Sequence, residues 1–154
     1  MSLKKKILWG LATILIAMQF FQPQPNQSDK ITDLHVEKLY EMPREVKAIL
    51  TRSCYDCHSD NTTYPWYRRF QPVAWYMASH IEEGKRELNF SEFGTYSFRK
   101  QRNKFRSMSN QVKNEEMPLS SYLLIHRHAN LSSEEKQTLV DWFDKKGEGI
   151  SNVD

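Results

Sequence analysis

The sequence predicts an all-α protein: one helical domain preceded by an apolar N-terminal helix. Apolar residues recur at helical spacing in several stretches of the 154-residue chain, as they do in amphipathic helices. Residues that commonly begin helices, such as Pro43, Pro72 and Ser132, stand before these stretches. No convincing strand surrounds the two cysteines, and the chain has no internal repeat. The length is enough for one domain and a targeting segment.

Residues 1–21 are expected to be that targeting segment. Lys4, Lys5 and Lys6 precede a mostly apolar run at residues 7–21. As a helix this run would extend about 22 Å, short of the roughly 30 Å hydrocarbon core of a bilayer. The small-residue cleavage pattern is poor, so we expect an uncleaved signal anchor; a cleaved signal peptide and a buried domain helix are the alternatives. Because positive charge stays in the cytoplasm, the rest of the chain is expected to be exported.

The charge of the chain gives no indication of nucleic-acid binding. The formal net charge is +3, and the three N-terminal lysines account for all of it, since the other 19 basic side chains balance 19 acidic ones. Proline and glutamine dominate residues 22–27, which predicts a linker. We therefore assign residues 22–42 to a linker and an N-terminal extension that is partly helical.

The domain is expected at residues 43–147, beginning with a short helix that runs into Cys54 and has Val46, Ile49 and Leu50 on one face. A loop should follow at residues 61–65. Pro72 then opens a helix with a stripe formed by Val73, Tyr76, Met77, His80, Ile81, Gly84 and Leu88.

Two more helices complete the expected domain. The first runs from about residue 95 to residue 112, with Ser91 as its N-cap and an inward face of Phe98, Arg102, Phe105, Met108 and Val112. Its opposite side carries a basic cluster, which is either a solvated helix face or a docking patch for an acidic partner: Arg99, Lys100, Arg102, Lys104 and Arg106. The last helix begins at a capping box from Ser132 to Glu135, ends at Gly147, and leaves a tail at 148–154. Its inward residues are Leu139, Val140, Trp142 and Phe143.

Both cysteines lie in one motif, Cys54-Tyr55-Asp56-Cys57-His58, which has the spacing of a c-type haem attachment site. Two thiols one helical turn apart can each form a thioether with one vinyl group of a porphyrin, and the adjacent imidazole can bind the iron. The alternatives are weaker. A zinc site lacks a second ligand pair at the usual spacing, a redox dithiol lacks strand–helix surroundings, and a disulfide between these cysteines would be strained.

The second axial ligand is predicted to be Met117, because its thioether is a soft iron ligand and the following Pro118 stiffens the loop. His80 is the alternative. The remaining candidates are expected elsewhere: Met77 and Met108 in the core, and His35, His126 and His128 on the surface or in loops. The aromatic residues Trp66, Tyr67 and Phe70 are expected near the haem edge.

Further motifs accompany this site: Ser53–Ser59, Tyr64–Tyr67, Pro72 with Trp75, His80, Glu83-Gly84, Leu88–Ser91, Met117-Pro118 and Leu131–Trp142. Over residues 43–145 they resemble the small bacterial haem-binding domain family of exported c-type cytochrome-like proteins. The resemblance implies a helical cytochrome c-like fold, one covalently attached haem and an envelope location. It also implies that Cys54, Cys57 and His58, with Met117, hold the haem.

We therefore expect a mono-haem c-type cytochrome that carries single electrons on the periplasmic side of the inner membrane, anchored by residues 7–21. Its partners would be redox proteins of the envelope, and no catalytic base or nucleophile is visible. The alternative is a haem-based peroxidase or gas sensor with an open or labile distal site, for which His80 would be the distal group.

Overall fold

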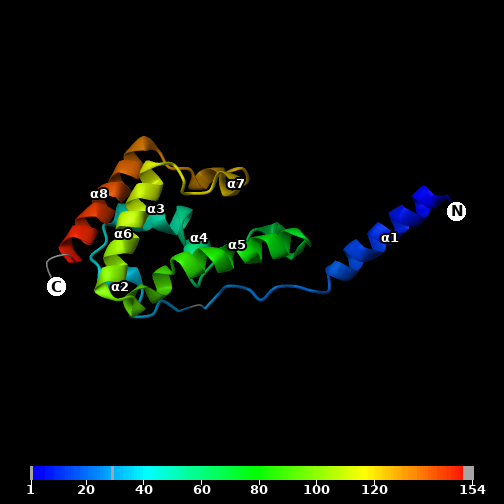
Figure 1. Ribbon diagram of the computed structural model, residues 1–154, viewed down its shortest axis with the longest axis horizontal. Helices are drawn as coiled ribbons and strands as arrows, with labels where there is room; N and C mark the ends of the chain where they lie inside the picture. Colours follow the sequence, from blue (N-terminus) through cyan, green and yellow to red (C-terminus); the bar gives the residue numbers. More distant parts are fainter. Residues whose placement is uncertain (1, 29, 151–154) are drawn as a thin grey trace.

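The computed structural model describes residues 2–28 and 30–150, and within them the regular structure is helical. The one strand-like feature among these residues is an isolated antiparallel bridge between Gln27 and Asn61. This confirms the all-α prediction. The α-helices are α1 Leu3–Met18, α2 Val36–Leu39, α3 Arg44–Ser53, α4 Tyr55–His58, α5 Val73–Glu87, α6 Phe98–Lys113, α7 Ser120–Leu123 and α8 Ser133–Ile150 (Figure 1). Three short 3-10 helices connect them: η1 Trp66–Arg69, η2 Phe90–Thr95 and η3 Arg127–Ala129.

The core lies where α6 and α8 pack side by side and α3 contacts α8 (Figure 1). Phe105 is fully buried at its centre, with ring centroids 5.1 Å from those of Tyr40 and Phe93 and 5.6 Å from that of Trp142. Helical periodicity predicted most of this core correctly, because these residues are buried: Val46, Ile49, Leu50, Phe105, Met108, Val112, Leu139, Val140, Trp142 and Phe143. Phe98 was predicted to face inward and does not, since 56% of its surface is exposed.

Two helix ends differ from the predictions. Ser91 does not cap α6; it lies buried in η2, and the cap is Ser97, whose Oγ accepts from the Lys100 N–H. Gly147 does not end α8, which continues to Ile150. Gly147 is buried against Phe105 of α6, and this packing offsets the roughly 1 kcal/mol by which glycine disfavours a helix interior. Of the expected tail, 148–150 are therefore helical, and 151–154 lie outside the described residues.

The capping box at the start of α8 is confirmed. The Ser132 N–H donates to the Glu135 carboxylate at 2.9 Å, and the Glu135 N–H donates to the Ser132 hydroxyl at 3.2 Å. Glu135 also pairs with Arg52 of α3 at 2.8 Å. The beginning of α8 is therefore fixed both to its own first turn and to α3.

The apolar N-terminal run forms α1, which extends away from the body of the domain (Figure 1). None of its 16 residues is buried. Within the described part of the chain, no helix combines the length and the apolar character needed to cross a bilayer.

Candidate functional site

The site is built on α4, a single helical turn that follows α3 directly. The Cys57 and His58 N–H groups both donate to the Cys54 carbonyl, at 3.2 and 3.0 Å, so the three residues share one turn. Both cysteines are free thiols. Burial raises the pKa of Cys54 to about 12 and that of Cys57 to about 11. The thiols are therefore protonated at neutral pH, which does not fit a redox-active dithiol, whose attacking cysteine has a lowered pKa.

His58 is held in one tautomer by the end of α5. Its Nδ1 lies 2.9 Å from the Gly84 carbonyl oxygen and 3.1 Å from the Leu88 carbonyl oxygen. Because carbonyl oxygens only accept hydrogen bonds, Nδ1 carries the proton and the lone pair is on Nε2. Burial, the largest influence, lowers the pKa of His58 and keeps the ring neutral. A neutral imidazole with its second nitrogen anchored to a carbonyl is the form in which histidine binds a metal.

Gly84 explains how α5 reaches His58. A Cβ atom on this residue would lie 2.7 Å from the Cys57 carbonyl oxygen and 3.2 Å from the Cys57 Cβ. Real Cβ atoms do not approach backbone oxygen so closely, and only glycine allows α5 to cross α4 at this distance. The glycine in the expected stripe is thus part of the site, a role that periodicity alone did not indicate.

A second segment, 119–126, is attached to α4 by polar contacts. The Tyr122 hydroxyl donates to the Asp56 carboxylate at 2.8 Å. Burial, followed by Asp56, raises the pKa of Tyr122, so the hydroxyl keeps its proton. The His126 ring stacks on Tyr122 with centroids 4.2 Å apart, and its Nε2 accepts from the Tyr67 hydroxyl at 3.2 Å. Sequence reasoning missed Asp56 and Tyr122, and no local signal pairs residues this far apart in the chain.

Large apolar side chains are exposed on both sides of α4. On α5, Val73 and Met77 lie close to three and two turns before Gly84, on the face that meets α4; Val73 is exposed and Met77 half-buried. On the other side, Leu119, Leu124 and Ile125 are exposed around α7. Large apolar side chains that are left exposed commonly mark a binding site. Two free thiols, a metal-ready imidazole and apolar flanks fit a covalently held haem.

The two candidates for the sixth ligand lie on different elements. Met117 is half-buried in the segment that joins α6 to α7. His80 is on α5, where its Nδ1 donates to the Tyr76 carbonyl at 2.9 Å and its ring centroid lies 4.1 Å from that of Tyr76.

The other predicted residues have mixed outcomes. His35 was expected on the surface or in a loop: it lies in the loop before α2, but its side chain is buried. Its Nδ1 accepts from the Glu37 N–H as the cap of α2, and its ring packs against Tyr55. Of the aromatic residues expected near the haem edge, Trp66 and Phe70 are exposed and Tyr67 is half-buried. His128 is exposed, and His126 lies in the loop between α7 and η3, both as expected; the His126 ring is half-buried between Tyr67 and Tyr122.

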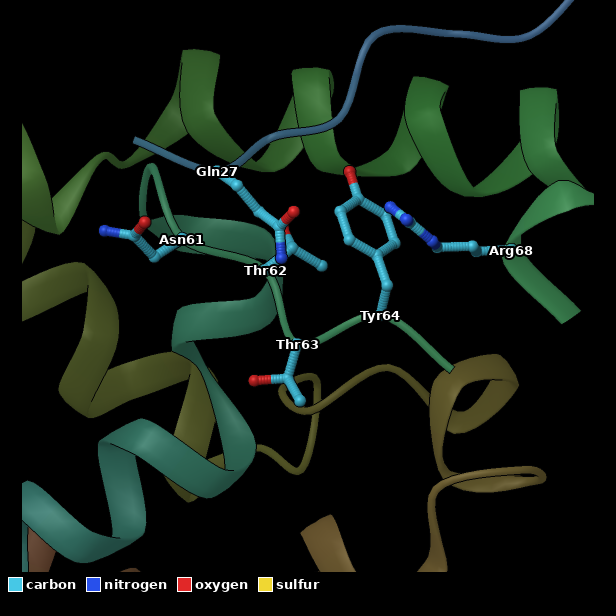
Figure 2. A pocket seen from close by; sticks show the side chains of 6 residues that line it. All are labelled: Gln27, Asn61, Thr62, Thr63, Tyr64 and Arg68. Carbon is cyan, nitrogen blue, oxygen red and sulfur yellow. The ribbon is translucent and has the colours of Figure 1, made fainter. Parts of the chain in front are cut away.

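A separate hollow lies beside the loop that follows α4, and it is lined by Gln27, Asn61, Thr62, Thr63, Tyr64 and Arg68. Figure 2 shows the Arg68 side chain beside the Tyr64 ring, and its guanidinium carbon lies 5.1 Å from the ring centroid. This lining is polar and contains none of the thiol or imidazole groups described above, so we do not identify it as the cofactor site. No group of three or more His, Cys, Asp or Glu side chains within residues 2–28 and 30–150 could hold a metal ion by itself.

Comparison with known families gives one match, and its extent includes nearly all of the described helices. The family model described as the haem-binding domain matches residues 13–145. No curated protein and no solved structure matches the chain. The matched region contains α4 with Cys54, Cys57 and His58, the exposed apolar residues on α5 and around α7, and the segment before α2.

Proposed function

The chain belongs to the haem-binding domain family, and from this premise we propose that it is a mono-haem c-type cytochrome that carries single electrons in the bacterial cell envelope. Cys54 and Cys57 hold the haem through thioether bonds, and His58 is the proximal iron ligand. The observation that carries the proposal is the His58 ring, whose Nδ1 is anchored to the Gly84 and Leu88 carbonyls. That arrangement leaves Nε2 for iron beside two free thiols.

The position of α5 favours Met117 over His80 as the sixth ligand. The two nitrogens of an imidazole point in nearly opposite directions, and Nδ1 of His58 points at α5. Nε2, the nitrogen that would bind iron, therefore points away from α5, so a residue of another element is better placed to supply a second ligand. His80 lies on α5 itself, one turn from Gly84. Met117 precedes α7, whose Tyr122 is bonded to Asp56 of the attachment turn.

Haem supplies a one-electron couple, and the residues of this chain set the conditions for it. The carbonyls of Gly84 and Leu88 hold the His58 ring in one orientation, so little rearrangement would accompany a change of charge. The apolar side chains around α7 and along α5, exposed in the chain alone, would cover a bound haem and exclude water from it, which would influence its potential. No catalytic acid or nucleophile is required for this role.

The envelope location is part of the same proposal. Lys4–Lys6 lie in the first turn of α1, ahead of its apolar residues, so the domain would stand on the exported side, where it would exchange electrons with redox proteins of the envelope. Residues 7–21 would contact the inner membrane. The exposed basic residues of α6, Arg99, Lys100 and Arg106, offer a docking surface for an acidic partner.

The test is the optical spectrum and mass of the protein matured in a host that attaches haem covalently. We expect the protein to exceed the mass of the bare chain by that of one haem. Its ferric spectrum should be low-spin, with the weak far-red band of His/Met coordination. Met117→Ala should become high-spin, whereas His80→Ala and the matched control Met77→Ala should remain low-spin.

Three results would contradict the proposal in different places. A colourless protein with the mass of the bare chain would contradict covalent attachment of haem to Cys54 and Cys57. A spin change in His80→Ala alone would exchange the ligand assignment. A wild-type protein that is high-spin and takes up carbon monoxide would indicate an open distal site, as in a peroxidase or gas sensor.

A further inference from the structure

The segment between α1 and α2 lies along the domain and is hydrogen-bonded to it. We call residues 19–28 of this segment the strap. At its start, the side-chain oxygen of Gln19 accepts from the Gln71 N–H at 3.0 Å. The Phe21 carbonyl accepts from the Gln71 side chain at 2.7 Å and from the Trp75 indole N–H at 2.9 Å. The Gln22 side chain donates to the Arg69 carbonyl at 3.1 Å. The first half of the strap is therefore bonded to the end of η1 and the start of α5.

The second half is bonded to the loop after the attachment turn. The Asn26 N–H donates to the Tyr64 hydroxyl at 2.8 Å, and the Asn26 side chain donates to the Ser59 carbonyl at 2.8 Å. Lys85 of α5 donates to the Asn26 side-chain oxygen at 2.7 Å. Because the strap is held at both ends, α1 projects from the domain in one direction (Figure 1). A flexible tether would not give such a fixed direction.

Exposed aromatic rings gather where the strap meets η1 and α5. The aromatic collar, as we name this set, consists of Phe20, Phe21, Trp66, Phe70 and Trp75. Trp66 is 83% exposed, and its ring contacts that of Phe70 with centroids 5.9 Å apart. Trp75 and Gly84 are nine residues apart on α5, which is two and a half turns, so Trp75 faces away from the attachment turn. Contact with a haem on α4 therefore does not account for Trp75.

We propose that the aromatic collar is a bilayer-interface surface, through which the haem domain rests on an anionic lipid surface beside α1. Tryptophan and other amphipathic rings concentrate at the level of lipid headgroups. Arg69 is exposed among the collar residues, and its charge would attract anionic headgroups. This inference rests on the envelope location in the proposed function, and it adds a second contact that holds the domain against the membrane in one orientation.

The properties of α1 favour lipid over a protein partner at the collar. Its 16 residues are all solvent-accessible, and it extends only about 24 Å, less than the roughly 30 Å hydrocarbon core. A helix of this length brings whatever follows it close to the lipid surface. Phe20 and Phe21 follow directly, and the strap holds them next to Trp75. The collar thus continues the apolar surface of α1 at the depth where aromatic rings are favoured.

The experiment uses the full-length haem protein and tryptophan fluorescence. A Trp9→Phe background removes the tryptophan of α1 and leaves Trp66 and Trp75 in the collar and Trp142 in the core. Emission is compared in phosphatidylcholine–phosphatidylglycerol vesicles with and without brominated acyl chains, and flotation measures vesicle binding. We expect a blue shift and quenching by bromine in the background protein. Adding Trp66→Ser with Phe70→Ser should remove most of the quenching of Trp75, while Phe98→Ser, an exposed ring on α6, should leave it unchanged.

Equal quenching in the collar variant and in the Trp9→Phe background would overturn the proposal. So would binding to vesicles without quenching by bromine, or a failure to bind vesicles at all. A surface that binds a protein partner instead would give no quenching in pure lipid. The visible spectrum of the same samples reports haem attachment independently. A colourless protein that is quenched by bromine would therefore contradict the proposed function and support the collar, and a haem protein without quenching would do the reverse.

Discussion

The α6–α8 core and the α4 site use the same kinds of side chain in opposite ways. In the core, Phe105 is fully buried and surrounded by other aromatic rings. Beside the site, Leu124 is 77% exposed, and Val73 and Ile125 are also exposed. The α6–α8 core thus buries its apolar side chains within the chain alone, whereas the α4 site leaves apolar side chains exposed to a ligand. Because the family binds haem, the second region should depend on its cofactor for stability and the first should not.

The largest expected effect separates these two regions directly. Replacing both thiols, Cys54→Ser with Cys57→Ser, should abolish covalent haem entirely, as mass and haem staining will measure. Hydrogen exchange should then increase around α4 and α7, which lose their apolar cover, while α6 and α8 retain their protection. Unchanged exchange around α7 in the haem-free variant would show that the site is as complete as the core.

Truncating a side chain at the centre of the core should lower the stability of the fold and leave the haem site unchanged. Phe105→Ala removes a fully buried ring and should lower the free energy of unfolding by about 3–5 kcal/mol. Denaturant titration measures this change, and the haem spectrum should stay that of wild type as long as the protein is folded. Phe98→Ala, an exposed ring on the same helix, is the matched control and should change stability by less than about 0.5 kcal/mol. A similar loss in both variants would contradict the assignment of the core.

A smaller change tests the contact within the site region by which α5 packs on α4 and holds His58. Gly84→Ala places a methyl group against the Cys57 carbonyl, and the forced shift should cost about 1–3 kcal/mol. The shift moves the carbonyls that hold His58, so we expect an altered visible spectrum as well. Gly149→Ala is the control, because a Cβ there meets nothing within 4 Å. An unaltered spectrum in Gly84→Ala would mean that α5 does not position the ligand.

Sequence periodicity predicted the core well because burial there follows from the helix period. Val46, Ile49 and Leu50, for example, fall on one face and are all buried. It failed where a residue's environment is set by a distant segment. His35 is buried because it packs on Tyr55 of α4, and Gly147 stays helical because it packs on α6. Neither contact is visible in the local sequence.

The site was predicted only as far as its contiguous motif. The spacing of Cys54, Cys57 and His58 predicted that these residues share one helical turn, which they do, but not the carbonyls that anchor His58, since backbone atoms have no sequence signature. The Tyr122–Asp56 bond joins residues 66 positions apart. Its position depends on how α7 folds back onto α4, which the separate helical patterns do not determine. The motif thus predicts the chemistry of the site, and the tertiary fold determines its geometry.

The smallest expected effect belongs to the cap that fixes α8 in the core region. Glu135→Ala removes the carboxylate that accepts from the Ser132 N–H and pairs with Arg52. This change should lower the free energy of unfolding by about 1 kcal/mol at neutral pH.

The backbone hydrogen bond from Ser132 and the Arg52 charge hold the pKa of Glu135 below its usual 4.5. The carboxylate therefore stabilises the fold above pH 4.5, and this contribution is lost as pH falls through the lowered pKa. Urea titrations should show the stability difference from wild type narrowing over that acidic range. Glu148→Ala, an exposed carboxylate near the other end of α8, should show no such narrowing, and a pH-independent loss in Glu135→Ala would mean that the ionised carboxylate is not the source of the stabilisation.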